Sequence, residues 1–201
     1  MNQQVNVYYT YCMEKKNWTG DYHKYQRKLA DELLDYGLQE MFQVDGTEKR
    51  IEKESNGKPF LKGMEQYHFN ISNTDGMVVC AVSDRKIGVD AERKKPFRKG
   101  ILRKCAGPGE KAYILEAEEN VQQDLFFRLW TLKESYIKMT GEGMRIPLNE
   151  VEFDIIEEEE DIQITCSKEG KFYQKNNKEY WMSLCTKESA NVKWIQVNEG
   201  R

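Results

Sequence analysis

The chain has 201 residues, with 31 basic and 34 acidic side chains and a formal net charge of −3. This length can bury a sound core in one domain or two small ones, and the nearly balanced charge does not favour a nucleic-acid-binding protein. No apolar run approaches the ~18 residues of a membrane span, and the first residues lack the pattern of a signal peptide. We expect a globular protein that neither crosses a membrane nor binds nucleic acid.

The first half of the chain predicts a strand, a long helix and three more strands. Residues 5–11 alternate as a strand, and residues 22–42 place apolar side chains at helical spacing. Residues 45–57 are polar and rich in turn formers. Further strands are expected at about 67–72, 77–83 and 86–92.

The second half begins with a basic stretch from Arg93 to Lys104, which could be a solvated loop or a docking surface. Gly107-Pro108-Gly109 then breaks the chain before a short helix at about 110–118. A longer helix at 121–140 ends at Gly141, a residue typical of helix C-termini. The acidic run at 157–161 is expected to be a solvated strand end or hairpin tip. Strands are expected at about 150–157, 161–167, 171–174, 179–186 and 191–197.

Five cysteines are scattered along the chain without a Cys-x-x-Cys pair. An odd number of dispersed thiols argues against a disulfide framework and against a zinc site, and the chain has only 2 histidines. This pattern fits a protein of the reducing cytoplasm.

Three carboxylates and a lysine carry the main chemical signal. Asp90 and Glu92 lie two residues apart on a predicted strand, so they project to one face, roughly 6–7 Å apart. Glu134 and Lys138 are i,i+4 neighbours on the predicted helix. Asp90 and Glu92 alone are more often two solvated acids at a strand edge. With Glu134 they could form an oxygen site that suits Mg²⁺, with Lys138 reaching a phosphate beside it.

The segments Gly88-Val89-Asp90-Ala91-Glu92 and 130–138 resemble the paired signatures of the 4′-phosphopantetheinyl transferase superfamily. Two further segments, Gly57-Lys58-Pro59-Phe60 and 68–72, resemble its larger, single-chain members, of the surfactin-synthetase-activating type. The resemblance covers about residues 57–148. It implies an α+β fold of two similar halves related by a pseudo-twofold axis, with the ligand between them. The halves would be residues 1–100 and 101–201, and such a chain is expected to be a monomer.

The resemblance implies transfer of 4′-phosphopantetheine from coenzyme A to a serine of an apo acyl or peptidyl carrier protein, with release of adenosine 3′,5′-bisphosphate. Members of this type usually serve nonribosomal peptide or polyketide synthesis. Asp90, Glu92 and Glu134 would hold Mg²⁺. Glu134 would also be the base, Lys138 would stabilise phosphate charge, and Lys133 is a second phosphate-binding candidate.

Further candidates for coenzyme A binding are implied by the same resemblance. Lys58 corresponds to a nucleotide-contacting lysine, Ser72 to a phosphate contact, and Arg27 lies in a segment similar to the helix near the 3′-phosphate. Asn73 stands where the family usually has histidine, and its amide remains neutral.

The departure at Asn73 keeps an alternative open, namely a catalytically weak homologue that binds coenzyme A or a carrier protein. A metal-dependent nucleotide pyrophosphohydrolase is more remote, because no matching hydrolase motif is present.

Overall fold

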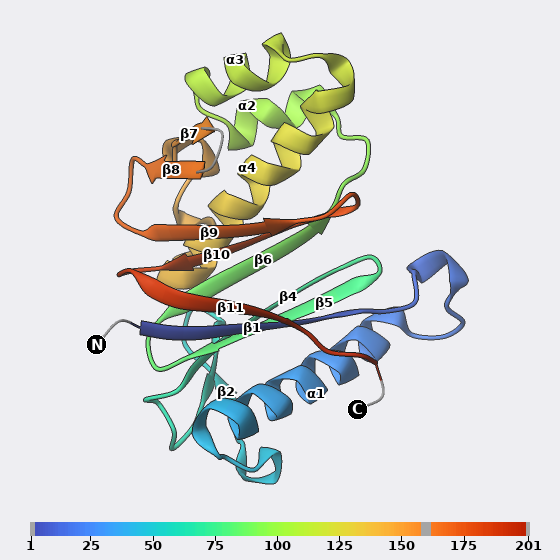
Figure 1. Ribbon diagram of the computed structural model, residues 1–201, viewed down its shortest axis with the longest axis vertical. Helices are drawn as coiled ribbons and strands as arrows, with labels where there is room; N and C mark the ends of the chain where they lie inside the picture. The colour runs from blue at the N-terminus through green and yellow to red at the C-terminus, as the bar shows by residue number, and fades with distance from the viewer. Residues whose placement is uncertain (1–2, 158–161, 200–201) are drawn as a thin grey trace.

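The computed structural model describes residues 3–157 and 162–199. Most of the expected acidic tip, residues 158–161, therefore lies outside the described residues. The chain forms an α+β fold, as predicted, in which two sheets face each other between two long helices (Figure 1). No described helix is long and apolar enough to cross a membrane. All five cysteines are free, in agreement with the expectation that they form no disulfide framework.

The first sheet has the strand order β11-β1-β5-β4, with β1 and β11 parallel and the other pairs antiparallel. The helix α1 (Tyr22–Phe42) covers its outer face, and the leucines of the predicted stripe are buried against it (Figure 1). Asp21 begins α1 by accepting a hydrogen bond from the backbone N–H of Lys24 at 3.0 Å. The strands of this sheet are β1 (Gln3–Tyr11), β4 (His68–Thr74), β5 (Met77–Ser83) and β11 (Ala190–Gln196).

The second sheet has the order β6-β10-β9 and is antiparallel throughout. The helix α4 (Glu119–Thr140) lies across its outer face, and Gly141, in the left-handed region at φ 76°, ends the helix. Gly88 permits the close approach of α4, because a Cβ there would lie 2.1 Å from the carbonyl oxygen of Ser135. The strands are β6 (Ile87–Arg93), β9 (Lys171–Asn176) and β10 (Tyr180–Thr186).

Each predicted half, residues 1–100 and 101–201, contributes one strand to the sheet formed mainly by the other half. The strand β6 precedes residue 100 but pairs with β10, and β11 returns beside β1. The sheets therefore do not follow the division at residue 100, and the two similar halves stay a prediction. The inner faces of β1, β5, β6 and β10 share one apolar cluster that joins the two sheets.

The smaller elements complete the two ends of the molecule. The strand β2 (Ile51–Lys53) lies in a segment expected to be irregular, and it pairs with β3 (Pro59–Leu61). The hairpin of β7 (Phe153–Glu157) and β8 (Ile162–Cys166) lies beside α3 (Pro108–Glu116) and α2 (Leu102–Cys105) in Figure 1. The 3₁₀ turns are η1 (Lys15–Asn17), η2 (Gly46–Glu48), η3 (Lys99–Ile101), η4 (Gly143–Arg145) and η5 (Leu148–Glu150).

Candidate active site

The predicted site residues meet where β4, β6 and α4 approach one another. Asp90 on β6 is only 5% exposed. Its Oδ1 accepts hydrogen bonds from Lys138 Nζ at 2.7 Å and from Ser72 Oγ at 2.8 Å. Two residues from two other elements, Ser72 on β4 and Lys138 on α4, thus contact the Asp90 carboxylate, and the sequence analysis had named all three as candidate site residues.

The negative charge of Asp90 acts on the carboxyl groups of Glu92 and Glu134. Burial raises the pKa of the Glu92 carboxyl, and the negative charge of Asp90 raises it further. The same two causes raise the pKa of the Glu134 carboxyl, while the Lys138 ammonium opposes them. The three acids therefore form one electrostatic group with an excess of negative charge.

The donor chemistry of this group suits a hard divalent cation. Asp90 Oδ2 is buried and has no hydrogen-bond partner among the described residues, which is costly unless a cation or solvent satisfies it. In their present rotamers, however, no three acidic, histidine or cysteine side chains of residues 3–157 and 162–199 enclose an ion. Lys138 supplies positive charge to Asp90 instead. The residues fit Mg²⁺ by chemistry, and the ligand set stays a proposal.

Two grooves flank the acids. The first, which we call the Lys58 groove, measures about 540 Å³ and is lined by Lys58, Asn70, Glu134 and Lys138, among others. The second, which we call the aromatic groove, also measures about 540 Å³ and contains Glu92. Lys104 lines both grooves. The apolar side chains of the aromatic groove include Phe97, Phe126, Phe127 and Trp130.

The structure contradicts the phosphate-binding role expected of Lys133. Its side chain is 2% exposed and forms an ion pair with Glu110 at 2.7 Å. The amine also donates to the carbonyl oxygens of Leu148 and Val151. The physical reason is helical geometry: residues five apart differ by roughly 140° around the axis, so Lys133 and Lys138 cannot face the same phosphate.

Lys58, expected to contact the nucleotide, lines the Lys58 groove, and its ammonium group is already hydrogen-bonded. Nζ donates to the carbonyl oxygens of Lys138 at 2.6 Å, Met139 at 3.2 Å and Ile87 at 3.3 Å. Burial lowers the pKa of this amine to about 8. The Lys58 amine therefore ties the β2–β3 hairpin region to the end of α4, and a contact with the nucleotide stays a proposal.

Asn73 and Arg27 both lie beside Gln26 of α1. Asn73 Nδ2 donates to Gln26 Oε1 at 3.0 Å, so the residue in the usual histidine position has a partner of its own. Arg27 is the next residue along α1 and is exposed to solvent. Both remain candidates for coenzyme A contacts.

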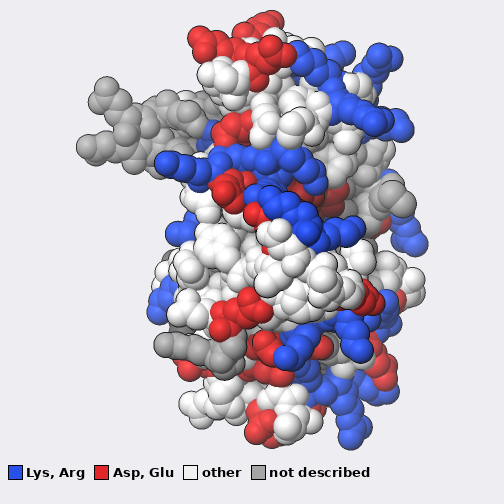
Figure 2. Space-filling model, turned by 90° about the vertical axis from the view of Figure 1, so that its right-hand side faces the viewer, with Lys and Arg blue, Asp and Glu red and all other residues white. Residues whose placement is uncertain are grey.

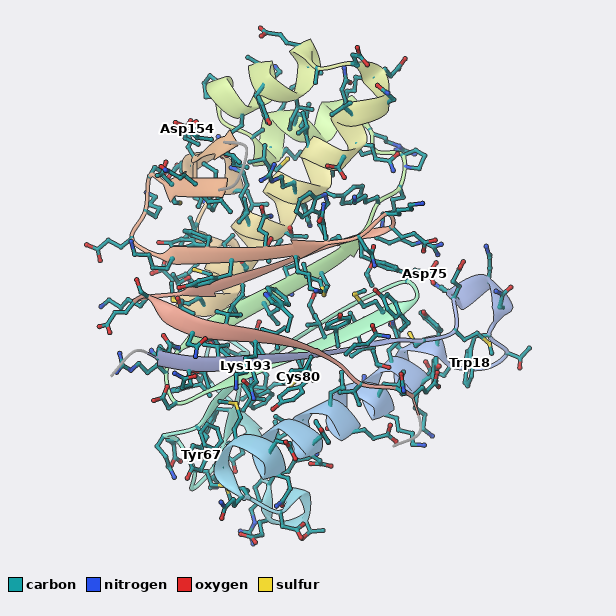
Figure 3. The ribbon with its side chains drawn as sticks, in the orientation of Figure 1. Trp18, Tyr67, Asp75, Cys80, Asp154 and Lys193 are labelled. Atoms are coloured by element: carbon teal, nitrogen blue, oxygen red, sulfur yellow. The ribbon has the colours of Figure 1, made fainter. Side chains whose placement is uncertain are left out.

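The basic run divides into paired and exposed residues. Arg93 forms ion pairs with Glu14 at 2.8 Å and with Asp75 at 3.8 Å, and Figure 3 places Asp75 at the turn after β4. Lys94 is paired with Asp124. Figure 2 shows Lys and Arg side chains in the upper half of the face on which the loop after β6 lies, and further ones in its lower half. The exposed members of the run are Lys95, Arg98, Lys99, Arg103 and Lys104.

Sequence reasoning did not single out Thr74 or Glu110. Thr74 Oγ1 donates to Glu92 Oε2 at 3.2 Å, and Glu110 is the buried partner of Lys133. A signal for Thr74 exists, because polar residues recur at 70, 72 and 74 on a predicted strand and so share one face. Glu110 is the third residue of α3 and accepts from the backbone N–H of Gly107, so its position indicates a helix start but not its pairing with Lys133.

Comparison with known proteins identifies the family of this chain. The profile of the 4′-phosphopantetheinyl transferase superfamily matches residues 86–185. The 4′-phosphopantetheinyl transferase Sfp of Bacillus subtilis is 33% identical over 131 residues, which cover 64% of this chain and 58% of that protein. The corresponding enzyme gsp of Aneurinibacillus migulanus is 36% identical over 62% of this chain and 52% of its own. The chain belongs to the 4′-phosphopantetheinyl transferase superfamily.

Two further likenesses are more distant. The 4′-phosphopantetheinyl transferase psf-1 of Bacillus pumilus is 27% identical over 175 residues, which cover 84% of this chain and 74% of that protein. The solved holo-acyl-carrier-protein synthase of Thermotoga maritima gives a TM-score of 0.40 at 15% identity, over 50% of this chain and 61% of its own. This TM-score is too low to support a conclusion about function. The chain spans little more than half the length of several of the relatives it matches.

Proposed function

We propose that this protein transfers 4′-phosphopantetheine from coenzyme A to a serine hydroxyl of an apo carrier protein and releases adenosine 3′,5′-bisphosphate. The observation that carries the proposal is the buried Asp90, which is bonded to Lys138 and Ser72 and retains one unpartnered oxygen beside Glu92 and Glu134. Membership of the superfamily supports the same reaction.

In this proposal Asp90, Glu92 and Glu134 would hold Mg²⁺, which when bound neutralises pyrophosphate oxygens as a Lewis acid. Glu134 takes the proton of the incoming serine, and burial favours this because it raises the pKa of the carboxyl. The serine oxygen bonds to the phosphorus that carries pantetheine, and the bond from that phosphorus to the bridging oxygen breaks. Lys138 stabilises the phosphate charge in this step.

The two grooves offer separate places for the two substrates. We assign coenzyme A to the Lys58 groove, which Lys58 and Lys138 line and where Lys138 Nζ donates to Ser72 Oγ at 2.9 Å. We assign the carrier protein to the side of the aromatic groove, whose rim includes Lys95, Arg98 and Lys104. An acidic carrier helix would meet positive charge there. We further propose a monomer that works in the cytoplasm on carriers of nonribosomal peptide or polyketide synthesis.

The test combines the protein with coenzyme A, Mg²⁺ and an apo carrier domain, and the carrier is then weighed by mass spectrometry. A phosphopantetheine adduct that is absent in excess chelator supports the proposal. An unmodified carrier together with bound coenzyme A supports the weak-homologue alternative, which the neutral Asn73 motivates. Cleavage of coenzyme A without a carrier would identify a hydrolase instead.

A further inference from the structure

Two strands from different sheets meet at the site through side chains. The strand β4 is at the edge of the first sheet, and β6 is at the edge of the second. Edge strands present backbone N–H groups without ladder partners. Here, side chains of β4 serve as hydrogen-bond acceptors for backbone N–H groups of β6. Asn70 Oδ1 accepts from the backbone N–H of Val89 at 2.8 Å, and Thr74 Oγ1 accepts from that of Arg93 at 3.2 Å.

The same row of β4 side chains holds the carboxylates of β6. Asn70, Ser72 and Thr74 share one face and are all buried. Ser72 donates to Asp90, and Thr74 donates to Glu92 Oε2 at 3.2 Å. Because the Thr74 oxygen accepts from Arg93 N–H, its single proton remains available for Glu92. The row thus orients both acids as well as joining the sheets.

Glu92 needs such a restraint. Asp90 and Glu92 are like-charged side chains two residues apart on one face of β6, so their carboxylates repel each other. The exposed Lys95 ammonium lies 3.9 Å from the same oxygen, Glu92 Oε2, on the solvent side. Without the Thr74 hydroxyl, rotation towards Lys95 and solvent would relieve the repulsion. Thr74 is therefore what keeps this carboxylate in the row.

We propose that Thr74 is a positioning residue, whose hydroxyl holds the Glu92 carboxylate beside Asp90 so that the two acids present their oxygens together to a divalent cation. This inference rests on the proposed function. Partners that orient metal ligands typically change metal affinity or activity by about 10–100-fold when they are removed. Thr74 does not itself touch the substrate in this account.

The test measures coenzyme A binding by calorimetry, without a carrier, once in Mg²⁺ and once in chelator. The dissociation constant in chelator divided by that in Mg²⁺ gives the factor by which the metal strengthens coenzyme A binding, which we call the metal-linked ratio. Thr74→Val keeps the shape but removes the hydroxyl, and we expect it to reduce this ratio by about tenfold while leaving the affinity in chelator unchanged. Thr74→Ser retains the hydroxyl and should keep the wild-type ratio. Thr74→Ala replaces Thr74→Val if thermal unfolding shows that the valine variant does not fold.

The second arm uses Glu92→Gln as background. If Thr74 acts through Glu92, Thr74→Val should cause no further loss of the metal-linked ratio in the Glu92→Gln protein. An equal loss in both backgrounds, an equal loss with and without Mg²⁺, or no loss in either would overturn the inference. A wild-type protein that binds coenzyme A equally with and without Mg²⁺ would refute the metal site itself, and the positioning role with it. An unchanged Thr74→Val alone would refute only the positioning role.

Discussion

Replacing Lys133 by methionine should destabilise the protein without weakening coenzyme A binding. The substitution keeps an unbranched chain of similar length but removes the ammonium, which contacts Glu110 and the carbonyl oxygens of Leu148 and Val151. Glu110 would remain buried, and its remaining partners among residues 3–157 and 162–199 would be the backbone N–H groups of Gly107 and Phe153. Breaking a buried pair on one side costs about 3–5 kcal/mol.

The size of this loss follows from the burial of the pair. The two side chains are 2% and 3% exposed, so solvent cannot replace the missing partner. Proteins of this kind unfold with a free energy of about 5–15 kcal/mol, and the change would therefore remove a large fraction of the stability. The Lys133 amine also links α4 to the segment after it, because it donates to the carbonyl oxygens of Leu148 and Val151.

Urea denaturation followed by tryptophan fluorescence measures the free energy of unfolding, and calorimetry measures the affinity for coenzyme A. Lys133→Met combined with Glu110→Met provides the matched control. It removes both charges, so it should recover much of the stability lost in the single variant. A single variant that keeps its stability but loses coenzyme A affinity would refute the reasoning and restore the phosphate-binding role.

Three more expectations concern the site and its surroundings. Lys58 has a pKa of about 8 in the folded protein against an ordinary 10.5, so the unfolded chain binds more protons between these values. The free energy of unfolding should thus rise with pH across that window and do so less in Lys58→Met; identical pH profiles would contradict this. Glu134→Gln should lower transfer by at least about 10²-fold while folding normally, as judged by single-turnover mass spectrometry, because an amide cannot accept the serine proton. Near-normal turnover would exclude Glu134 as the base. Reversing Arg98, Lys99 and Arg103 to glutamate should raise KM for the carrier and flatten its salt dependence, with KM for coenzyme A unchanged. Reversal of the exposed Lys171, Lys187 and Lys193 changes net charge equally and should have little effect. A loss of coenzyme A affinity instead would assign the basic run to the nucleotide.

Local patterns in the sequence were sufficient for most of the elements and for the centre of the site. The helix α1 has the predicted bounds, and α4 ends before Gly141 as expected. Asp90 lies against Ser72 and Lys138, all three predicted from motifs. The periods of strands and helices are set by the backbone, so the bounds of these helices and the face on which a side chain projects can be derived from a few neighbouring residues. Ser72 was named through the resemblance to the superfamily, and the roles of all three residues stay predictions.

The sequence by itself thus determined which residues share a face of one strand or one helix. Only the tertiary structure decided which faces meet. It turned Lys133 towards Glu110, brought Thr74 to Glu92 and returned β11 to the side of β1. These contacts join segments from different elements or sheets, and their geometry depends on how whole elements pack. Gly88 illustrates the reason, because the absence of one Cβ lets α4 approach β6 and so brings Glu134 and Lys138 to Asp90.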